Sequence, residues 1–214
     1  MSKVTIIDYG MGNLLSVRRA LEHLGAEVTL STDPTVISKA DRLVLPGVGA
    51  FGDGMHALNQ NGLSDAVKAF AQTGRPLLGI CLGAQMLLDS SEEFGTHQGL
   101  GLIPGQVTAI PHQDKQGNHL NVPHMGWADL QPANDNGFDN PLLATTEAGS
   151  SLYFVHSFQA QPSHPSDLAA TCDYAGNTLT AVVQHRNVIG CQFHPEKSGP
   201  VGLNMLKHFL ALNA

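Results

Sequence analysis

The sequence carries little charge and no excess of positive charge. Charged residues make up 14% of its 214 residues, against about 25% in typical soluble proteins. There are 11 Lys and Arg against 18 Asp and Glu, which gives a formal net charge of −7. Nucleic acids and anionic membranes are held through clustered cationic side chains. The composition argues against both, and we expect a small molecule or another protein as the partner.

Cysteine and long apolar runs are also scarce. The three cysteines, Cys81, Cys172 and Cys191, are odd in number and scattered, so they do not suggest a disulfide framework. No stretch approaches the roughly 20 apolar residues of a membrane-spanning helix. The apolar run near the N-terminus is too short for a signal peptide. These features favour a reducing compartment, and we expect a cytoplasmic protein.

The first half of the chain alternates between strand and helix patterns. Short apolar runs at 4–8, 26–30, 42–45 and 76–80 are typical of buried strands. Between the first two runs, apolar residues recur at helical spacing over 14–24. Strands that alternate with helices form parallel sheets, so this half predicts a doubly wound α/β fold.

After residue 95 the pattern changes to short strands separated by Gly, Asn and Pro. The predicted strands are 106–110, 152–155, 168–171, 179–184 and 188–192. A final helix is predicted over 201–212, with apolar residues on one side. Because no linker, repeat or low-complexity segment divides the chain, we expect a single domain over residues 1–214.

Cys81 has the surroundings of a reactive nucleophile. It lies between Gly79 and Gly83, after the apolar strand 76–80 and before a helix predicted to run to about residue 90. A nucleophile elbow has this Gly-x-nucleophile-x-Gly form. Its sharp turn exposes the side chain at a helix N-terminus, where the thiolate is favoured. A buried core cysteine is the alternative, and the flanking glycines argue against it.

A second motif, His194-Pro195-Glu196, follows the last predicted strand. Two-residue spacing in an extended segment points His194 and Glu196 the same way, and Pro195 disfavours a helix at this place. A cysteine nucleophile needs a base, and the base needs a third group that orients it. We therefore predict a catalytic triad of Cys81, His194 and Glu196. A surface His-Pro turn is the alternative.

A glycine-rich loop follows the third predicted strand. Its glycines, in the segment 46–54 that includes Gly47 and Gly49, let backbone N–H groups approach a ligand closely. Acyl transfer needs such donors for the oxyanion, so we predict an oxyanion loop here. The segment also fits Gly-x-Gly-x-x-Gly, but no acidic residue follows about 20 positions on, as a dinucleotide site requires.

Eleven histidines raise the question of a metal site. Cys191 and His194 have a ligand-like spacing, but no second close pair completes a zinc site. We therefore predict no metal. The histidines expected at the surface or in turns are those at 112, 119, 124, 164 and 185.

Six motifs extend over nearly the whole chain. They are Asp8-Tyr9-Gly10-Met11-Gly12-Asn13-Leu14, Pro46-Gly47-Val48-Gly49, Gly79-Ile80-Cys81-Leu82-Gly83-Ala84-Gln85, Pro123-His124-Met125-Gly126-Trp127, Tyr153-Phe154-Val155-His156-Ser157 and Gln192-Phe193-His194-Pro195-Glu196-Lys197-Ser198. Together they resemble the glutaminase subunits of imidazole glycerol phosphate synthase, which are class I glutamine amidotransferases. The resemblance implies their flavodoxin-like three-layer α/β fold, with a central, mostly parallel sheet and helices on both faces.

By this resemblance, Cys81 attacks the side-chain amide of glutamine, ammonia leaves, and water hydrolyses the γ-glutamyl thioester while His194 moves the protons. The residues implied to hold the oxyanion are Gly47, Val48, Gly49 and Leu82. Those implied to hold the amino-acid end of the substrate are Gln85 and Glu93. No cofactor is expected.

The resemblance also implies a heterodimer with a cyclase subunit that is a (β/α)8 barrel. Ammonia would pass to the cyclase for the synthesis of imidazole glycerol phosphate and AICAR from PRFAR in histidine biosynthesis. The residues expected to face this partner are Asn13, Arg18, Trp127 and Lys197. For Trp127, the only tryptophan, a place in the core is the alternative.

Three other functions stay open. Another class I glutaminase, serving a pyridoxal phosphate or anthranilate-type synthase, would share the triad and differ in its partner. A cysteine peptidase or chaperone on the same scaffold need not carry the His-Pro-Glu motif. In a non-enzymatic binding module the triad would be inert, and Cys81 would react with iodoacetamide no faster than a free thiol.

Overall fold

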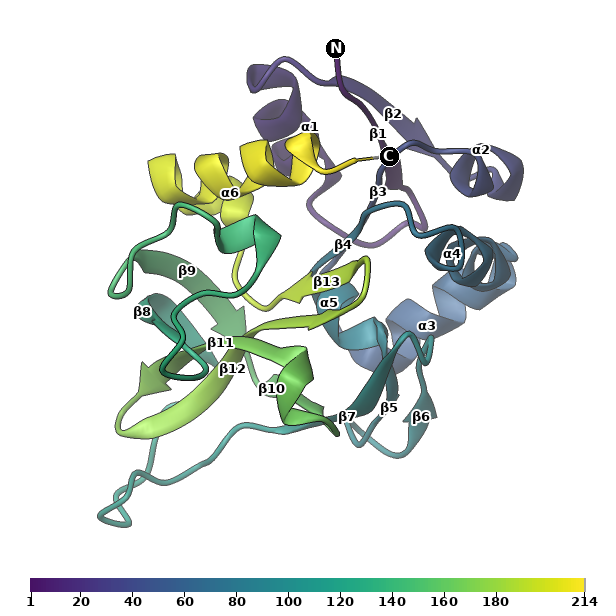
Figure 1. Ribbon diagram of the computed structural model, residues 1–214. Helices are drawn as coiled ribbons and strands as arrows, with labels where there is room; N and C mark the ends of the chain where they lie inside the picture. The colour runs from purple at the N-terminus through teal and green to yellow at the C-terminus, as the bar shows by residue number, and fades with distance from the viewer. Residues whose placement is uncertain (214) are drawn as a thin grey trace.

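A nine-stranded mixed sheet forms the centre of the computed structural model, which describes residues 1–213 (Figure 1). Its strands lie in the order β2-β1-β3-β4-β13-β12-β11-β8-β9. The parallel part consists of β2 Glu27–Ser31, β1 Lys3–Ile7, β3 Leu43–Gly47, β4 Leu77–Cys81 and β13 Val188–Cys191. The antiparallel part consists of β12 Asn177–His185, β11 Leu168–Tyr174, β8 His124–Pro132 and β9 Ser151–His156. The parallel part has the strand order of flavodoxin-like folds.

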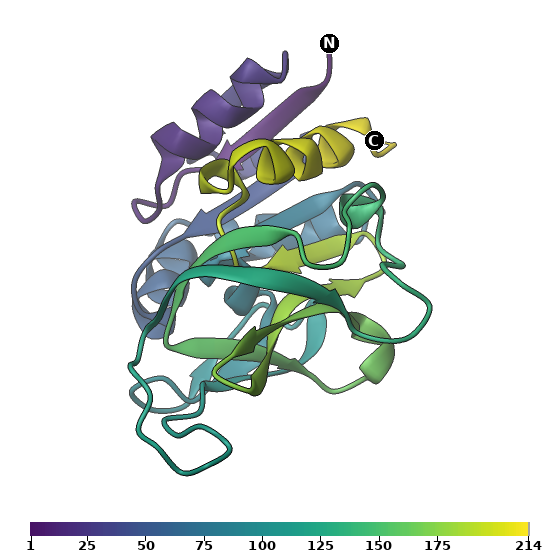
Figure 2. The same ribbon diagram turned by 90° about the vertical axis from the view of Figure 1, so that its left-hand side faces the viewer.

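Helices cover both faces of the parallel part, which confirms the predicted three-layer α/β fold (Figures 1 and 2). One face carries α1 Leu14–His23 and α6 Gly199–Ala211, and the other carries α2 Pro34–Ser38, α3 Phe51–Gln60 and α4 Leu63–Ala71. The connections contain the 3-10 helices η1 Pro141–Leu143, η2 Pro165–Asp167 and η3 Pro195–Lys197. Within residues 1–213, none of the helices has both the length and the apolar character that a membrane span requires.

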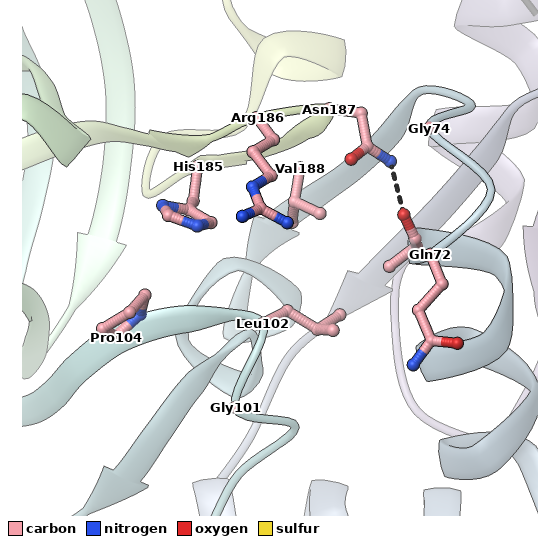
Figure 3. A pocket seen from close by; sticks show the side chains of 10 residues that line it. Gln72, Gly74, Gly101, Leu102, Pro104, His185, Arg186, Asn187 and Val188 are labelled. Carbon is pink, nitrogen blue, oxygen red and sulfur yellow. Dashed lines mark hydrogen bonds between the residues drawn. The ribbon is translucent and has the colours of Figure 1, made fainter.

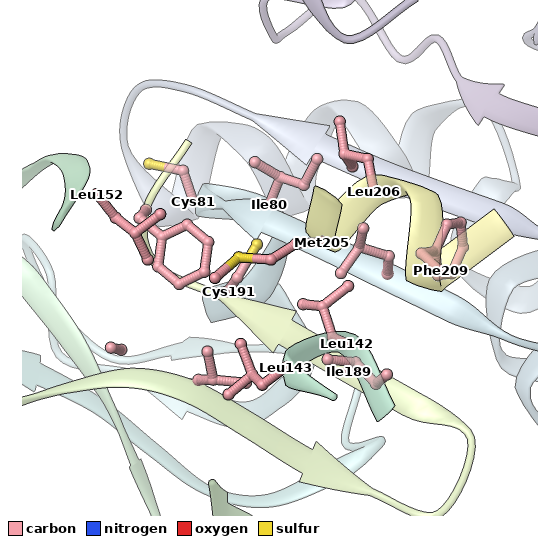
Figure 4. Packing of buried hydrophobic residues seen from close by; sticks show 14 of the residues in the cluster. Ile80, Cys81, Leu142, Leu143, Leu152, Ile189, Cys191, Met205, Leu206 and Phe209 are labelled. Carbon is pink, nitrogen blue, oxygen red and sulfur yellow. The ribbon is translucent and has the colours of Figure 1, made fainter. Parts of the chain in front are cut away.

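Alternating side chains of β4 build two cores, one on each face of the sheet. Leu78 and Ile80 pack toward α1 and α6, whereas Leu77 packs toward the helices of the opposite face. Phe209 of α6 belongs to the same cluster as Ile80 (Figure 4). These side chains are at most 1% exposed, and the burial of each stabilises the fold by about 1.5–3 kcal/mol. Cys81, at the margin of this cluster, therefore ends a strand that is buried on both faces.

A smaller four-stranded sheet, in the order β10-β7-β5-β6, adjoins helix α5 Leu82–Met86. Its strands are β10 Phe158–Pro162, β7 Ile103–Ala109, β5 Leu88–Ser91 and β6 His97–Gln98. The sequence patterns predict β7 but not the other three strands, and they also do not predict β8 of the large sheet. The chain after Cys81 therefore contains more strand than its sequence indicates.

The helix after Cys81 is shorter than predicted, because α5 ends at Met86 and not near residue 90. Leu88 begins β5, which pairs in parallel with β7 at Ile103. Gly99 passes so close to this strand that a Cβ on Gly99 would lie 2.1 Å from the carbonyl oxygen of Leu88. Tertiary pairing thus overrides the helical spacing of the apolar residues.

Helix α5 lies directly on β3 and β4, with almost no side chain between the backbones. A Cβ on Gly83 would lie 1.8 Å from the carbonyl oxygen of Leu45, and a Cβ on Gly79 would lie 2.8 Å from the backbone nitrogen of Ala84. Neither glycine has a positive φ. Both are needed for the close approach of two backbones, and this approach sets where the chain turns at Cys81.

Replacing Gly83 with alanine should destabilise the protein strongly, because the new methyl group meets backbone that cannot rotate away. We expect a loss of about 3 kcal/mol in the free energy of unfolding, measured by urea denaturation. Gly52→Ala is the matched control, since the atoms nearest to its Cβ would be those of the His97 ring, at 2.8–3.0 Å. There alanine also favours the helix, so the loss should stay below about 1 kcal/mol. Equal losses in the two variants would contradict this account.

Candidate active site

The carboxyl ends of β3, β4 and β13 meet at one edge of the sheet, the edge at which open α/β folds bind ligands. Gly47 at the end of β3 pairs in register with Cys81 at the end of β4. A cavity of about 280 Å³ opens here. It is lined by Val48, Gly49, Cys81, Leu82, Gln85, Glu93, Pro123, Val155, His156, Ser157, Phe158 and His194. The predicted nucleophile, base, oxyanion loop and substrate residues therefore lie around one cavity.

A second cavity, of about 630 Å³, lies at the amino ends of β4 and β13, away from this edge (Figure 3). Its walls come from the turn between β12 and β13, which includes Arg186, and from the end of α4 with Gln72. None of the residues predicted from the sequence to form a site lines it. The smaller cavity is therefore the candidate active site.

Cys81 forms the predicted nucleophile elbow. It occupies the N-cap of α5 with φ 55° and ψ −113°. A non-glycine residue in such a conformation costs about 1–3 kcal/mol and persists only where its surroundings enforce it. The strain falls on the cysteine itself, not on the flanking glycines. The sulfur lies 3.8 Å from the carbonyl oxygen of Val155, and Nε2 of Gln192 donates to it at 3.8 Å.

His194 and Glu196 are paired, but not through the extended segment that their spacing predicts. His194 itself is extended, whereas Pro195 begins the 3-10 helix η3, because a proline is tolerated in the first turn of a helix. Nδ1 of His194 lies 2.8 Å from Oε1 of Glu196, and the two side chains are 3% and 0% exposed. Glu196 thereby fixes the ring orientation and leaves the other ring nitrogen for chemistry. Within residues 1–213, Nε2 of His194 has no hydrogen-bond partner. His194 and Cys81 line the same cavity, so this nitrogen is the one available to a substrate held there.

The surroundings of His194 favour its protonated form. Burial by itself lowers the pKa of the imidazole, but the proximity of Cys81 and the hydrogen-bonded carboxylate of Glu196 outweigh this effect and raise the pKa to about 9. Neighbouring His156 shows the opposite behaviour, because burial lowers its pKa to about 4. Of these two imidazoles beside the cavity, His194 is therefore the one that holds a proton near neutral pH.

The predicted oxyanion loop is packed against Tyr9. The hydroxyl of Tyr9 donates to the carbonyl oxygen of Pro46 at 2.8 Å, and a Cβ on Gly47 would lie 2.5 Å from that hydroxyl oxygen. Gly49 has φ +102°, which favours glycine. On the other side of Cys81, Leu82 begins α5, so its backbone N–H has no intrahelical acceptor. Val48, Gly49 and Leu82 line the same cavity as Cys81, from two elements.

Gln85 and Glu93 occupy the end of the cavity next to the smaller sheet. Nε2 of Gln85 donates to the carbonyl oxygen of Phe158 and to Oε1 of Gln192, both at 2.9 Å. This leaves Oε1 of Gln85 as its free acceptor. Oε2 of Glu93 accepts from the backbone nitrogen of Phe51 at 2.7 Å, which ties it to the start of α3. Two acceptors in this place suit the ammonium group of an amino acid.

Of the four residues predicted to face a partner, Trp127 and Lys197 lie near one another, at the ring of Tyr153, whereas Asn13 and Arg18 belong to α1 and its N-terminus. Trp127 is 58% exposed, so the alternative of a core anchor is wrong. Its ring packs against Tyr153 with centroids 6.0 Å apart, and Nζ of Lys197 lies 5.9 Å from the Tyr153 ring centroid. Asn13 lies at the N-terminus of α1, which packs against η3. Arg18 points to solvent, where its Nε pairs with Glu22 at 2.7 Å.

Several residues of the site are not apparent from the sequence patterns. His124 was expected at the surface or in a turn, but it is 3% exposed and its Nδ1 lies 3.1 Å from Nε2 of His156. The expectation fails because His124 is in the unpredicted strand β8, where its ring stacks on Phe154 and Tyr174. Gln192 was also missed. Its one signal is its place as the first residue of the motif at 192–198.

Known proteins resemble this chain over almost its full length. The family model "Glutamine amidotransferase class-I" matches residues 5–212. Imidazole glycerol phosphate synthase subunit HisH 1 of Legionella pneumophila (strain Lens) is 48% identical, with 99% of this chain and 100% of the relative covered. Subunit HisH of Lacticaseibacillus casei (strain BL23) is 51% identical, with 96% and 94% covered. Among solved structures, that of PurLQS from Thermotoga maritima has a TM-score of 0.73 at 22% identity, with 99% of each chain covered, which shows a shared fold.

The raised pKa of His194 predicts a pH-dependent stability. A pKa that is higher in the folded state than its ordinary value of 6.5 stabilises the fold below that value, and this contribution is lost as the pH rises through about 9. The free energy of unfolding should therefore fall between these pH values by about 1–3 kcal/mol more in the wild type than in His194→Asn. Urea denaturation at several pH values measures this. Cys172 and Cys191 are buried in both proteins, so the effect of their titration on stability cancels in the comparison. Parallel stability curves would contradict the prediction.

Proposed function

Because this chain belongs to the class I glutamine amidotransferases, in the family of imidazole glycerol phosphate synthase subunits HisH, we propose that it hydrolyses glutamine through Cys81, His194 and Glu196 and supplies the ammonia to a cyclase partner. The main support for the proposed triad is the hydrogen bonding of His194. Its Nδ1 is held by Glu196 at 2.8 Å, and its Nε2 has no partner within residues 1–213. A base oriented in this way is what an activated cysteine requires.

In the first step, the thiolate of Cys81 bonds to the amide carbon of glutamine and the carbonyl electrons move to the oxygen. The tetrahedral intermediate then breaks its C–N bond while Nε2 of His194 gives its proton to the leaving nitrogen, which departs as ammonia. Water next adds to the thioester, Nε2 takes a proton from it, and the C–S bond breaks to release glutamate. General acid and base catalysis by a positioned group contributes about 10²–10⁴-fold to the rate.

The negative oxygen of each intermediate is held by backbone N–H groups. Leu82 offers its donor at the N-terminus of α5, where the helix dipole also favours negative charge. Gly47, Val48 and Gly49 offer donors from the neighbouring loop, because the end of β3 is in register with Cys81. Loss of one such donor typically costs about 10²–10³-fold in kcat.

Gln85 and Glu93 select the amino-acid end of the substrate. Both N–H bonds of the Gln85 amide are used within the protein, so Oε1 is the group that it can offer to a substrate. The carboxylate of Glu93 supplies a negative charge next to it. Together they would accept hydrogen bonds from the α-ammonium group of glutamine and place its side-chain amide toward Cys81.

The partner would bind on an apolar patch that reaches the cavity. This β8–β9 patch consists of Met125, Trp127, Tyr153 and Val155, which pair across the two strands. Met125 is 67% exposed, and the carbonyl oxygen of Val155 lies 3.8 Å from the sulfur of Cys81. Exposed aromatic and methionine side chains are enriched in protein interfaces. Ammonia released at Cys81 would therefore leave beside the docking surface.

We propose that this partner is a (β/α)8 cyclase, that the two form a heterodimer, and that the ammonia serves the conversion of PRFAR to imidazole glycerol phosphate and AICAR in histidine biosynthesis. The relatives are named as subunits of imidazole glycerol phosphate synthase, which supports this partner over a pyridoxal phosphate or anthranilate-type synthase. The paired and buried His194 argues against an inert binding module. The free thiols fit a reducing cytoplasm.

Replacing Cys81 with alanine should abolish the use of glutamine and leave the fold and the complex intact. The purified complex with the cyclase would be assayed for product with glutamine and, separately, with an ammonium salt. We expect the wild type to use both and Cys81→Ala to use only ammonium, because the cyclase takes ammonia from any source. Glutamate release by Cys81→Ala would show that the nucleophile is wrong. If wild type releases no glutamate, the proposed function itself fails.

Replacing Trp127 with alanine should weaken binding of the cyclase by about 2 kcal/mol or more. A tryptophan that is exposed in the free subunit and becomes buried in the complex is a typical hot spot of an interface. Titration calorimetry with the isolated subunits measures the change. Val36→Ala is the control. Val36 is also exposed, at 38%, but it lies on helix α2 and not on strands β8 and β9. An equal affinity of both variants for the cyclase would place the docking surface elsewhere.

A further inference from the structure

We propose that Ser198 is a positioning residue for glutamine hydrolysis, whose buried hydroxyl holds the catalytic turn 194–198 on the backbone of Tyr153 and so keeps His194 facing Cys81. Ser198 touches neither the cavity nor the reacting atoms, and it acts through His194. The inference rests on the proposed triad and is independent of the identity of the partner.

The hydroxyl of Ser198 makes two hydrogen bonds in a buried place. The residue is 2% exposed. Its Oγ donates to the carbonyl oxygen of His194 at 2.6 Å and accepts from the backbone nitrogen of Tyr153 at 3.0 Å. The backbone nitrogen of His194 in turn donates to the carbonyl oxygen of Tyr153 at 2.9 Å. Both backbone polar groups of Tyr153 are thus taken by the catalytic turn.

The same geometry links the turn to the β8–β9 patch. Tyr153 is opposite Trp127 in the antiparallel pairing. Because its N–H and C=O point away from β8, toward the turn, this is a non-hydrogen-bonded pair, in which side chains approach most closely. The ring of Tyr153 lies 6.5 Å from the ring of His194. Tyr153 therefore packs against Trp127 with its side chain and bonds to the turn that carries His194 with its backbone.

The other contacts of the turn do not replace the hydroxyl. The carbonyl oxygen of His194 also accepts from Lys197 at 3.0 Å, but this bond lies inside the turn and moves with it. On the far side, a Cβ on Gly202 would lie 2.1 Å from the carbonyl oxygen of Pro195, so α6 presses directly on the turn. Without the hydroxyl, the N–H of His194 makes the one remaining hydrogen bond from the turn to β9 within residues 1–213, and the backbone N–H of Tyr153 loses its acceptor.

The test compares Ser198→Ala with Ser198→Thr, which restores the hydroxyl, and with Ser64→Ala as a matched control. Ser64 is also buried, at 6%, and its hydroxyl donates to Asn59, but it lies on α4, away from the site. Glutaminase activity of each full complex with the cyclase gives kcat and KM. We expect Ser198→Ala to lower kcat by about 10- to 100-fold, as a slightly misplaced catalytic group does. KM for glutamine should stay near the wild-type value, because Gln85 and Glu93 are on other elements.

A second readout does not depend on glutamine. The rate at which iodoacetamide alkylates Cys81, followed by peptide mass spectrometry from pH 6 to pH 9.5, reports the pairing of the thiol with His194. In Ser198→Ala the rate at neutral pH should fall relative to the rate at alkaline pH. In Ser64→Ala the profile should match the wild type. If Ser198→Ala does not fold, Ser198→Cys keeps a weaker donor of similar size and should show the same changes to a lesser degree.

The inference is overturned if Ser198→Ala and Ser64→Ala share one alkylation profile, or if Ser198→Ala raises KM at an unchanged kcat. It is equally overturned if Ser198→Thr, once folded, recovers nothing. Failure of the proposed function looks different, because there the wild-type complex releases no glutamate. The alkylation profiles still decide the role of Ser198 in that case.

Discussion

The site depends on a contact between two stretches of backbone, where α5 lies on β3 at Gly83 and Leu45. No side chain fits between them, since a Cβ there would lie 1.8 Å from a carbonyl oxygen. The chain must therefore reverse direction within one residue at the end of β4, and Cys81 takes the strained conformation that this requires. Because Gly47 ends the same strand β3 in register with Cys81, the contact also brings the predicted oxyanion loop next to Cys81.

The two halves of the large sheet contribute differently to the site. The parallel half supplies Cys81 at the end of β4 and the glycine-rich loop after β3. Strand β13 pairs in parallel with β4 and antiparallel with β12, and His194 follows directly after this junction. The antiparallel half supplies the wall of the cavity at Val155 and the exposed ring of Trp127. In the proposed complex, the docking strands consequently contact the base through Tyr153, while the nucleophile stays on the more deeply buried half.

Local patterns in the sequence predicted the parallel half and the turn at Cys81, for physical reasons. A buried parallel strand is a short apolar run, and the elbow at Cys81 is encoded by adjacent glycines. The features that the sequence did not predict have a common cause. They depend on contacts between residues that are distant in the sequence. Helix α5 ends early because β5 pairs with β7. His124 is buried because aromatic rings from β9 and β11 pack against it. Ser198 could not be predicted to hold His194 because its second partner is the backbone of Tyr153, 45 residues away.

Strand β9 is the last strand of the large sheet. An open edge of this kind exposes unpaired backbone groups to which another chain can add a strand, and proteins protect such edges by covering them. Here the cover at Tyr153 is the catalytic turn itself, through His194 and Ser198. The segment that carries His194 thus also pairs the backbone of an edge strand. Any loosening of this segment would expose two unpaired backbone groups of β9 at the same time as it displaced the proposed base.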